Sequence, residues 1–97
     1  MSLTILAQIT AVPGQEDHLR EALLRLIPPT LQEEGCILYD LHTDNNRPGF
    51  FVFYETWETR ELWQAHMKSP HLAEHGRVTE GAVLDVQINE LTKCHSH

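Results

Sequence analysis

The segment Phe50–Trp57 restricts the fold more than any other, because it is apolar on both faces of an expected strand. Five of the seven aromatic residues of the 97-residue chain lie in it. Side chains alternate between the two faces of a strand. One face therefore carries Phe51, Phe53, Glu55 and Trp57, and the opposite face carries Phe50, Val52, Tyr54 and Thr56. Such a strand is expected at the centre of a sheet that is covered on both sides.

Three more segments show the two-residue period and predict strands. They are Leu3–Ala11, Cys36–Thr43 and Ala82–Leu91. The first has one apolar face, which is typical of a strand with one buried side. The run 43–49, which contains Asp, Asn, Pro and Gly, predicts the turn that joins the second strand to Phe50–Trp57.

A helical period separates the first two strands. From Gln15, apolar residues recur on one helical stripe with charged residues outside it: Leu19, Ala22, Leu23, Leu26 and Ile27. Pro28-Pro29 is expected to end or kink this helix. A short second segment is expected to reach Gly35, a residue type that commonly follows a helix end.

A second helical region follows Phe50–Trp57. Thr59 is the expected N-cap of a helix that reaches about Lys68. Ser69 as N-cap and Pro70 as the first helical residue predict another short helix, which ends at Gly76.

The order of these elements, βαββαβ, predicts an α+β fold of the ferredoxin-like type. Both helical regions would lie on one face of a four-stranded sheet, which leaves the other face bare. A bare apolar face indicates an interface or a ligand groove. We therefore expect a homodimer, a dimeric α/β barrel in which two sheets close face to face around a cavity. The expected domain covers residues 1–92, and residues 93–97 form a flexible polar tail.

Charge and composition exclude several classes of protein. Seven Lys and Arg residues against 14 Asp and Glu give a formal charge of −7, and there is no basic run, so nucleic acid is not an expected partner. No apolar stretch approaches the roughly 18 residues of a membrane span. The first residues lack the features of a signal peptide, and two cysteines do not make a disulfide framework. The cytoplasm is the expected location.

Three groups of residues carry a resemblance to a known family. They are Glu34-Gly35-Cys36-Ile37-Leu38-Tyr39, Phe51-Val52-Phe53-Tyr54-Glu55-Thr56-Trp57 and His66-Met67-Lys68-Ser69-Pro70-His71. Together they are similar to the antibiotic biosynthesis monooxygenase family, whose pattern runs roughly E-x-G-C-x-x-Y, then F-x-x-Y/F-E-x-W, then H-x-x-S-x-H. The resemblance covers almost the whole chain. It implies a dimeric α+β barrel and catalysis that often needs neither flavin nor metal, in a family that includes quinol and polyketide monooxygenases, haem-degrading enzymes and isomerases.

Oxygenation of a phenol or quinol without a cofactor needs a base, an apolar pocket for a planar ring and exclusion of water. His66 is the candidate base, because imidazole titrates near neutral pH and the residue matches the family motif. Glu55 shares a strand face with Trp57, and a carboxylate among aromatic residues is expected to have a raised pKa. The expected catalytic residues are His66, Glu55 and Trp57, and the expected substrate pocket includes Phe51, Phe53, Tyr39 and His71.

Each of these residues also has a purely structural interpretation. The aromatic residues could simply be core, and Glu55 could form an ion pair with Arg60 or Arg77. His66 could bridge two elements as a satisfied polar group. Tyr39 is expected to pack against the sheet rather than act as an acid.

The histidines raise the question of a metal site. The run His71-Leu72-Ala73-Glu74-His75 matches the H-x-x-E-H pattern of a zinc-peptidase group, and His66 could be a third ligand. The segment is short and the domain too small for a peptidase cleft, so no metal is expected. Haem degradation is not expected either, because haem-degrading members have an asparagine where this chain aligns Ile9. The expected tail holds three further residues that could bind metal adventitiously: Cys94, His95 and His97.

The sequence therefore predicts a small homodimer that oxygenates a quinol-like or polycyclic phenolic compound, with molecular oxygen as co-substrate and no cofactor. Two other functions stay open. A non-catalytic dimer of the same fold could bind a small apolar ligand. An isomerase of small oxygenated metabolites could use the same histidine and carboxylate to move protons.

Overall fold

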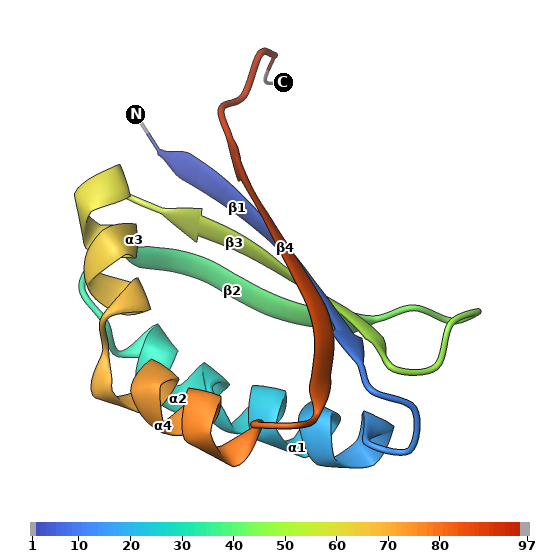
Figure 1. Cartoon of the computed structure of the whole chain (residues 1–97). Coiled ribbons are helices and arrows are strands. Elements are labelled where there is room, and N and C mark those ends of the chain that lie inside the picture. Colours follow the sequence, from blue (N-terminus) through green and yellow to red (C-terminus); the bar gives the residue numbers. More distant parts are fainter. Residues whose placement is uncertain (1, 96–97) are drawn as a thin grey trace.

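The computed structural model describes residues 2–95, and within this range four antiparallel strands form one sheet (Figure 1). The strands are β1 (Leu3–Ala11), β2 (Cys36–Thr43), β3 (Phe50–Trp57) and β4 (Val83–Leu91). Their order across the sheet is β2-β3-β1-β4, so β3 is an inner strand as predicted. Met1 and the last two residues of the expected tail, 96 and 97, lie outside the described residues.

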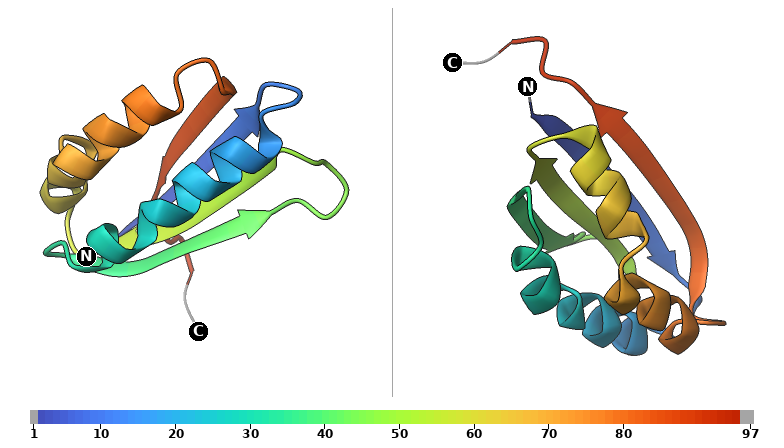
Figure 2. Two further views of the ribbon diagram at one scale, coloured as in Figure 1. Left: turned by 90° about the horizontal axis from the view of Figure 1, so that it is seen from below. Right: turned by 90° about the vertical axis from the view of Figure 1, so that its left-hand side faces the viewer.

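Each of the two crossover connections in residues 2–95 consists of two helices. They are α1 (Glu16–Arg25) and α2 (Ile27–Leu31), then α3 (Arg60–Met67) and α4 (Pro70–Val78). All four lie on the same face of the sheet (Figures 1 and 2). This arrangement confirms the α+β, ferredoxin-like fold. No helix in the described part of the chain combines the length and apolar character needed to cross a membrane.

The proline pair lies in the first turn of α2. α1 ends earlier, at Arg25, and α2 begins at Ile27. Proline has no backbone N–H, and the N–H groups of a first helical turn have no partner within the helix. The prolines therefore fit the start of a helix, and the predicted interruption takes the form of two helices in succession.

Side-chain caps set the start of α3 and of α4, as predicted. The Thr59 hydroxyl accepts the Leu62 N–H at 3.1 Å, and the Ser69 hydroxyl accepts the Leu72 N–H at 3.4 Å. α4 continues two residues past Gly76, its expected end, because Gly76 does not adopt a positive φ. The break between α3 and α4 gives the two helices different directions (Figure 2).

The helices cover one face of the sheet and leave the other open. On the covered face β3 buries four side chains, namely Phe51, Phe53, Glu55 and Trp57. On the opposite face β3 is only partly covered, and Tyr54 is 39% exposed. In the described part of the chain helices cover one side of β3, and the cover that the sequence predicts for its other side stays a prediction.

The edge strand β4 presents apolar residues that no helix buries. Val86 lies opposite Ile9 of β1, and Ile88 lies opposite Ala7. Since directly paired residues share a face of the sheet, Val86 and Ile88 point to the side on which the helices lie. Both side chains are nevertheless exposed, because β4 extends beyond the region that the helices cover.

Candidate functional site

A cavity of about 210 Å³ lies between the sheet and the helices. Strands β1 and β3 line it on one side, and residues of α1, α3 and α4 line it on the other. Val86 and Ile88 of β4 border it at the sheet edge. This space forms on the helix-covered side and within one chain, so it is not the cavity expected between two sheets, which stays a prediction.

Four of the seven predicted site residues line this cavity: Tyr39, Phe53, Glu55 and His66. Phe51 is buried and borders a different hollow between α1 and β2. Trp57 is fully buried next to the cavity rather than on its wall. His71 lines a neighbouring cavity of about 140 Å³. These three residues therefore do not line the main cavity, but Trp57 and His71 contact residues that do.

A flat aromatic wall forms one side of the site. The Tyr39 ring stacks on Phe53 with ring centroids 4.4 Å apart. It packs against the His66 ring in a T-shaped arrangement with centroids 5.5 Å apart. Burial raises the pKa of the Tyr39 hydroxyl far above its ordinary value, and a hydrogen bond with Thr30 opposes this only in part. Tyr39 therefore stays neutral and serves as a packed surface, which suits a planar ligand.

Glu55 places a carboxyl group inside the cavity. The residue is 4% exposed, and Trp57 Nε1 donates a hydrogen bond to its Oε1 at 2.9 Å. Burial raises the pKa of Glu55 to about 7, because water no longer solvates the charge; the indole N–H lowers it and Glu33 raises it further. The carboxyl can thus give or take a proton near neutral pH.

The ion pair considered for Glu55 is not formed. Arg60 instead pairs with Glu90, with Nε and Oε1 2.7 Å apart, and Arg77 bonds Glu74, three residues before it. Both pairs lie on the surface, whereas Glu55 faces the helices.

His66 is held in one orientation by a carboxylate. It lies in the last turn of α3, is 2% exposed, and its Nδ1 donates to Glu33 Oε2 at 2.6 Å. Burial lowers the pKa of His66, and the interaction with Glu33 opposes that shift. His66 does bridge two elements, as its structural interpretation supposed. Because Nδ1 is hydrogen-bonded to Glu33, Nε2 is the ring nitrogen that remains available to a molecule in the cavity.

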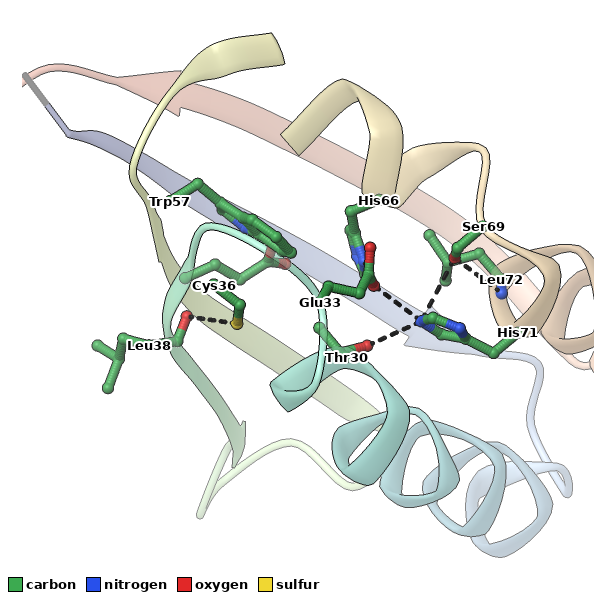
Figure 3. Close-up of polar contacts among 10 residues, drawn as sticks. Thr30, Glu33, Cys36, Leu38, Trp57, His66, Ser69, His71 and Leu72 are labelled. Carbon is green, nitrogen blue, oxygen red and sulfur yellow. Dashed lines mark hydrogen bonds and ion pairs between the residues drawn. The ribbon is translucent and has the colours of Figure 1, made fainter. Parts of the chain in front are cut away.

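The same oxygen of Glu33 also binds His71, in the first turn of α4 (Figure 3). His71 Nε2 lies 2.9 Å from Glu33 Oε2, and it also lies 3.2 Å from the Thr30 hydroxyl and 3.3 Å from the Ser69 hydroxyl. The break between α3 and α4 brings the two histidines to one carboxylate. Because the His71 side chain is 22% exposed, the cluster connects a buried imidazole to the surface.

Sequence reasoning missed Glu33 and selected its neighbour Glu34, which is exposed. The family pattern E-x-G-C places its glutamate two residues before the glycine, and in this chain that position is Glu33. Gly35 fixes the turn after it with φ +87°, and a Cβ there would lie 2.9 Å from the Leu62 Cβ on α3. The close approach of this turn to α3 brings Glu33 within reach of His66.

Comparisons with known proteins agree with this architecture. The profile of the family described as Antibiotic biosynthesis monooxygenase matches residues 2–77. "Probable quinol monooxygenase YgiN" of Escherichia coli is 33% identical over 101 aligned residues, which cover 92% of this chain and 95% of that protein.

Two solved structures have the same fold over nearly their whole length. PA3566 from Pseudomonas aeruginosa superimposes with a TM-score of 0.92 at 32% identity, covering 97% of this chain and 95% of that one. Rv0793 from Mycobacterium tuberculosis gives a TM-score of 0.88 at 27% identity, covering 99% and 98%. The chain belongs to the antibiotic biosynthesis monooxygenase family.

Proposed function

We propose that this chain is a cofactor-independent monooxygenase that oxidises a quinol-like or polycyclic phenolic compound with molecular oxygen. The observation that carries the proposal is the His66–Glu33 pair at the wall of an apolar cavity. A buried imidazole with its Nδ1–H bound to a carboxylate keeps Nε2 free as a base. The name of the E. coli relative supports a quinol as the substrate.

The cavity supplies the other requirements of the reaction. Tyr39 and Phe53 offer a flat surface against which an aromatic ring can stack, and the mostly apolar lining of the cavity disfavours bound water. Glu55, with its pKa near 7, can hold or return a proton at a second oxygen of the ring. Trp57 positions that carboxyl by its hydrogen bond.

The reaction balances without any other redox partner. His66 Nε2 takes the hydroxyl proton, and the electron-rich anion transfers electrons to O₂. One oxygen atom is added to a ring carbon that loses its hydrogen, and the other leaves as water. A quinol and O₂ thus give a hydroxyquinone and water.

The Glu33 carboxylate stabilises the charge that His66 gains. His66 Nδ1 and His71 Nε2 both donate to Glu33 Oε2, at 2.6 and 2.9 Å, so this oxygen faces the imidazolium that forms when His66 Nε2 takes the hydroxyl proton. This assigns His71 a positioning role, although its ring does not line the main cavity.

The test is oxygen uptake with reduced menadione, after subtraction of autoxidation. We expect His66→Gln to lower kcat about 10²- to 10⁴-fold, the usual contribution of a general base. His42→Gln is the matched control, because His42 is an exposed histidine on β2. The proposal fails if His66→Gln and His42→Gln have equal rates, or if no quinol in a panel gives enzyme-dependent uptake.

The same experiment separates the two other functions. A ligand-binding protein would bind the quinol tightly and show no turnover that depends on His66. An isomerase would convert its substrate equally well without oxygen.

We also propose that two copies of the chain associate through the bare face of the sheet. Tyr54 is 39% exposed there, and on β4 Leu91, which lies opposite Thr4 of β1, is 41% exposed. Sedimentation at micromolar concentration tests this, and an 11 kDa monodisperse species would contradict it.

A further inference from the structure

We propose that Glu33, His66 and His71 form a binding site for a divalent transition-metal ion such as Zn²⁺. Their ligand atoms, Glu33 Oε2, His66 Nδ1 and His71 Nε2, lie within 4.8 Å of one another. Two imidazoles and one carboxylate are a common ligand set for zinc, with a further position left for solvent. The site requires no substrate, so this part of the inference does not rest on the proposed function.

The distances are close to those of a bound ion. Ligand atoms about 2.0–2.1 Å from a zinc ion in a tetrahedral arrangement are separated by roughly 3.3 Å. Glu33 Oε2 is already 2.6 Å from His66 Nδ1 and 2.9 Å from His71 Nε2. These two separations need to widen by a few tenths of an ångström, and the two nitrogens need to approach each other. His71 can supply that movement, because its side chain is 22% exposed while that of His66 is enclosed.

The charges also suit a cation. In the absence of metal, two imidazole N–H groups share one carboxylate oxygen. A metal ion replaces those two protons and uses the lone pairs of both imidazoles. The Thr30 and Ser69 hydroxyls, 3.2 and 3.3 Å from His71 Nε2, can bond the carboxylate or a bound water.

This ligand set differs from the H-x-x-E-H pattern in the sequence. That pattern would use His71 with His75, but His75 Nδ1 is buried without a partner and is not part of the cluster. Glu74 is engaged by Arg77. Folding instead combines His71 with a histidine at the end of the preceding helix and with a glutamate 38 residues earlier.

Metal binding would change the nitrogen that faces the cavity. A neutral imidazole that binds a metal through Nδ1 carries its proton on Nε2. His66 Nε2 would then be a donor instead of a base. This consequence rests on the proposed function, and it predicts reversible inhibition of quinol oxidation by Zn²⁺.

Calorimetric titration with Zn²⁺ and visible absorption with Co²⁺ test the site without any enzyme assay. The tail ligands are removed first by Cys94→Ser, His95→Gln and His97→Gln in one parent variant. We expect one equivalent of metal to bind this parent, with the intense d–d bands of four-coordinate Co²⁺. Glu33→Gln should weaken binding more than about 100-fold, since loss of a ligand exceeds the 10- to 100-fold effect of losing its support.

Glu34→Gln and His75→Gln are the matched controls, and both should keep the parent affinity. Equal affinities for Glu33→Gln and Glu34→Gln would overturn the site, as would absence of binding to the parent. Should Glu33→Gln fail to fold, ¹⁵N shifts of the histidine rings decide the matter in the parent protein. Metal binding should change the ¹⁵N chemical shifts of His66 Nδ1 and His71 Nε2, and unchanged shifts of these two nitrogens would overturn the proposal.

Activity then separates the two proposals. Zinc binding with no oxidation of any quinol would leave the metal site standing and remove the proposed function. Oxidation that zinc does not inhibit at saturating, measured occupancy would remove the effect on the His66 base.

Discussion

The two faces of β3 carry similar side chains but meet different surroundings. Phe53 and Glu55 point to the helices and are buried, whereas Tyr54 and Thr56 point to the open face. The same alternation of apolar residues thus gives a cavity on one side and a bare surface on the other. The candidate site lies where the covering helices add polar groups of their own.

The largest difference between the faces should appear in stability. Trp57→Ala removes a fully buried indole, and we expect it to lower the free energy of unfolding by about 3–5 kcal/mol. Tyr54→Ala on the open face should cost about 1 kcal/mol or less. Urea denaturation at two protein concentrations measures both. Equal costs at the lower concentration would contradict the difference between the faces, and a Tyr54→Ala effect that grows with concentration would support the proposed association through the open face.

The pH dependence of stability should come from the covered face. The Glu55 carboxyl titrates near 4.5 when unfolded and near 7 when folded, so the folded chain holds an extra proton between these values. The stability that this proton contributes is complete below pH 4.5 and is lost as the pH rises through 7. The free energy of unfolding of Glu55→Gln, measured relative to that of the wild type, should therefore rise on the order of 3 kcal/mol between pH 4.5 and pH 8.

Glu58→Gln is the control for this effect, because Glu58 is an exposed carboxyl directly after β3. Thermal or urea unfolding across the pH range supplies the measurement. If the difference in the free energy of unfolding between wild type and Glu55→Gln does not change with pH through pH 7, the Glu55 carboxyl is solvated.

Substrate affinity should distinguish two neighbouring residues of β1. Ala7 lines the cavity, and Gln8 points to the open face. Ala7→Leu fills part of the space, so we expect KM for the quinol to rise about 10-fold or more. Gln8→Leu should leave KM unchanged. The reverse result would place the substrate on the open face and remove the cavity from the mechanism.

The smallest effect is expected from a polar pair on the open face. Gln8 Nε2 donates to Asn89 Oδ1 at 3.3 Å between β1 and β4. Asn89→Ala should lower stability by about 0.5–1 kcal/mol, the usual net value of such a bond. Asn45→Ala in the exposed β2–β3 turn is the control. A cost above about 2 kcal/mol for Asn89→Ala would show that this pair is sealed from water by a further layer.

Local residue patterns predicted the elements well, because caps and turn residues act over a few positions. Thr59 and Ser69 set helix starts that depend only on the next three residues. The end of α4 at Val78 was missed, since a glycine can also occupy a helix when neighbouring residues continue it. A two-residue period groups side chains on a face but does not say which face the helices cover. The position of the cavity depended on that choice.

The site was only partly predictable for a related reason. His66 and Glu55 were found from residue type and motif, and the raised pKa of Glu55 is confirmed. Glu33 was not found, because its partners lie 33 and 38 residues away and meet it only after folding. The catalytic roles themselves stay predictions until the variants are assayed.

The break between α3 and α4 determines how the two histidines are used. In one continuous helix, residues 66 and 71 would point about 140° apart, given 3.6 residues per turn. The cap at Ser69 and the ring of Pro70 instead let both imidazoles reach one carboxylate. The relative position of the two histidines thus depends on residues outside the cluster of Glu33, His66 and His71. Variation at positions 68–70 gives evolution, or a protein engineer, a means to change the geometry of this cluster while its three side chains are retained.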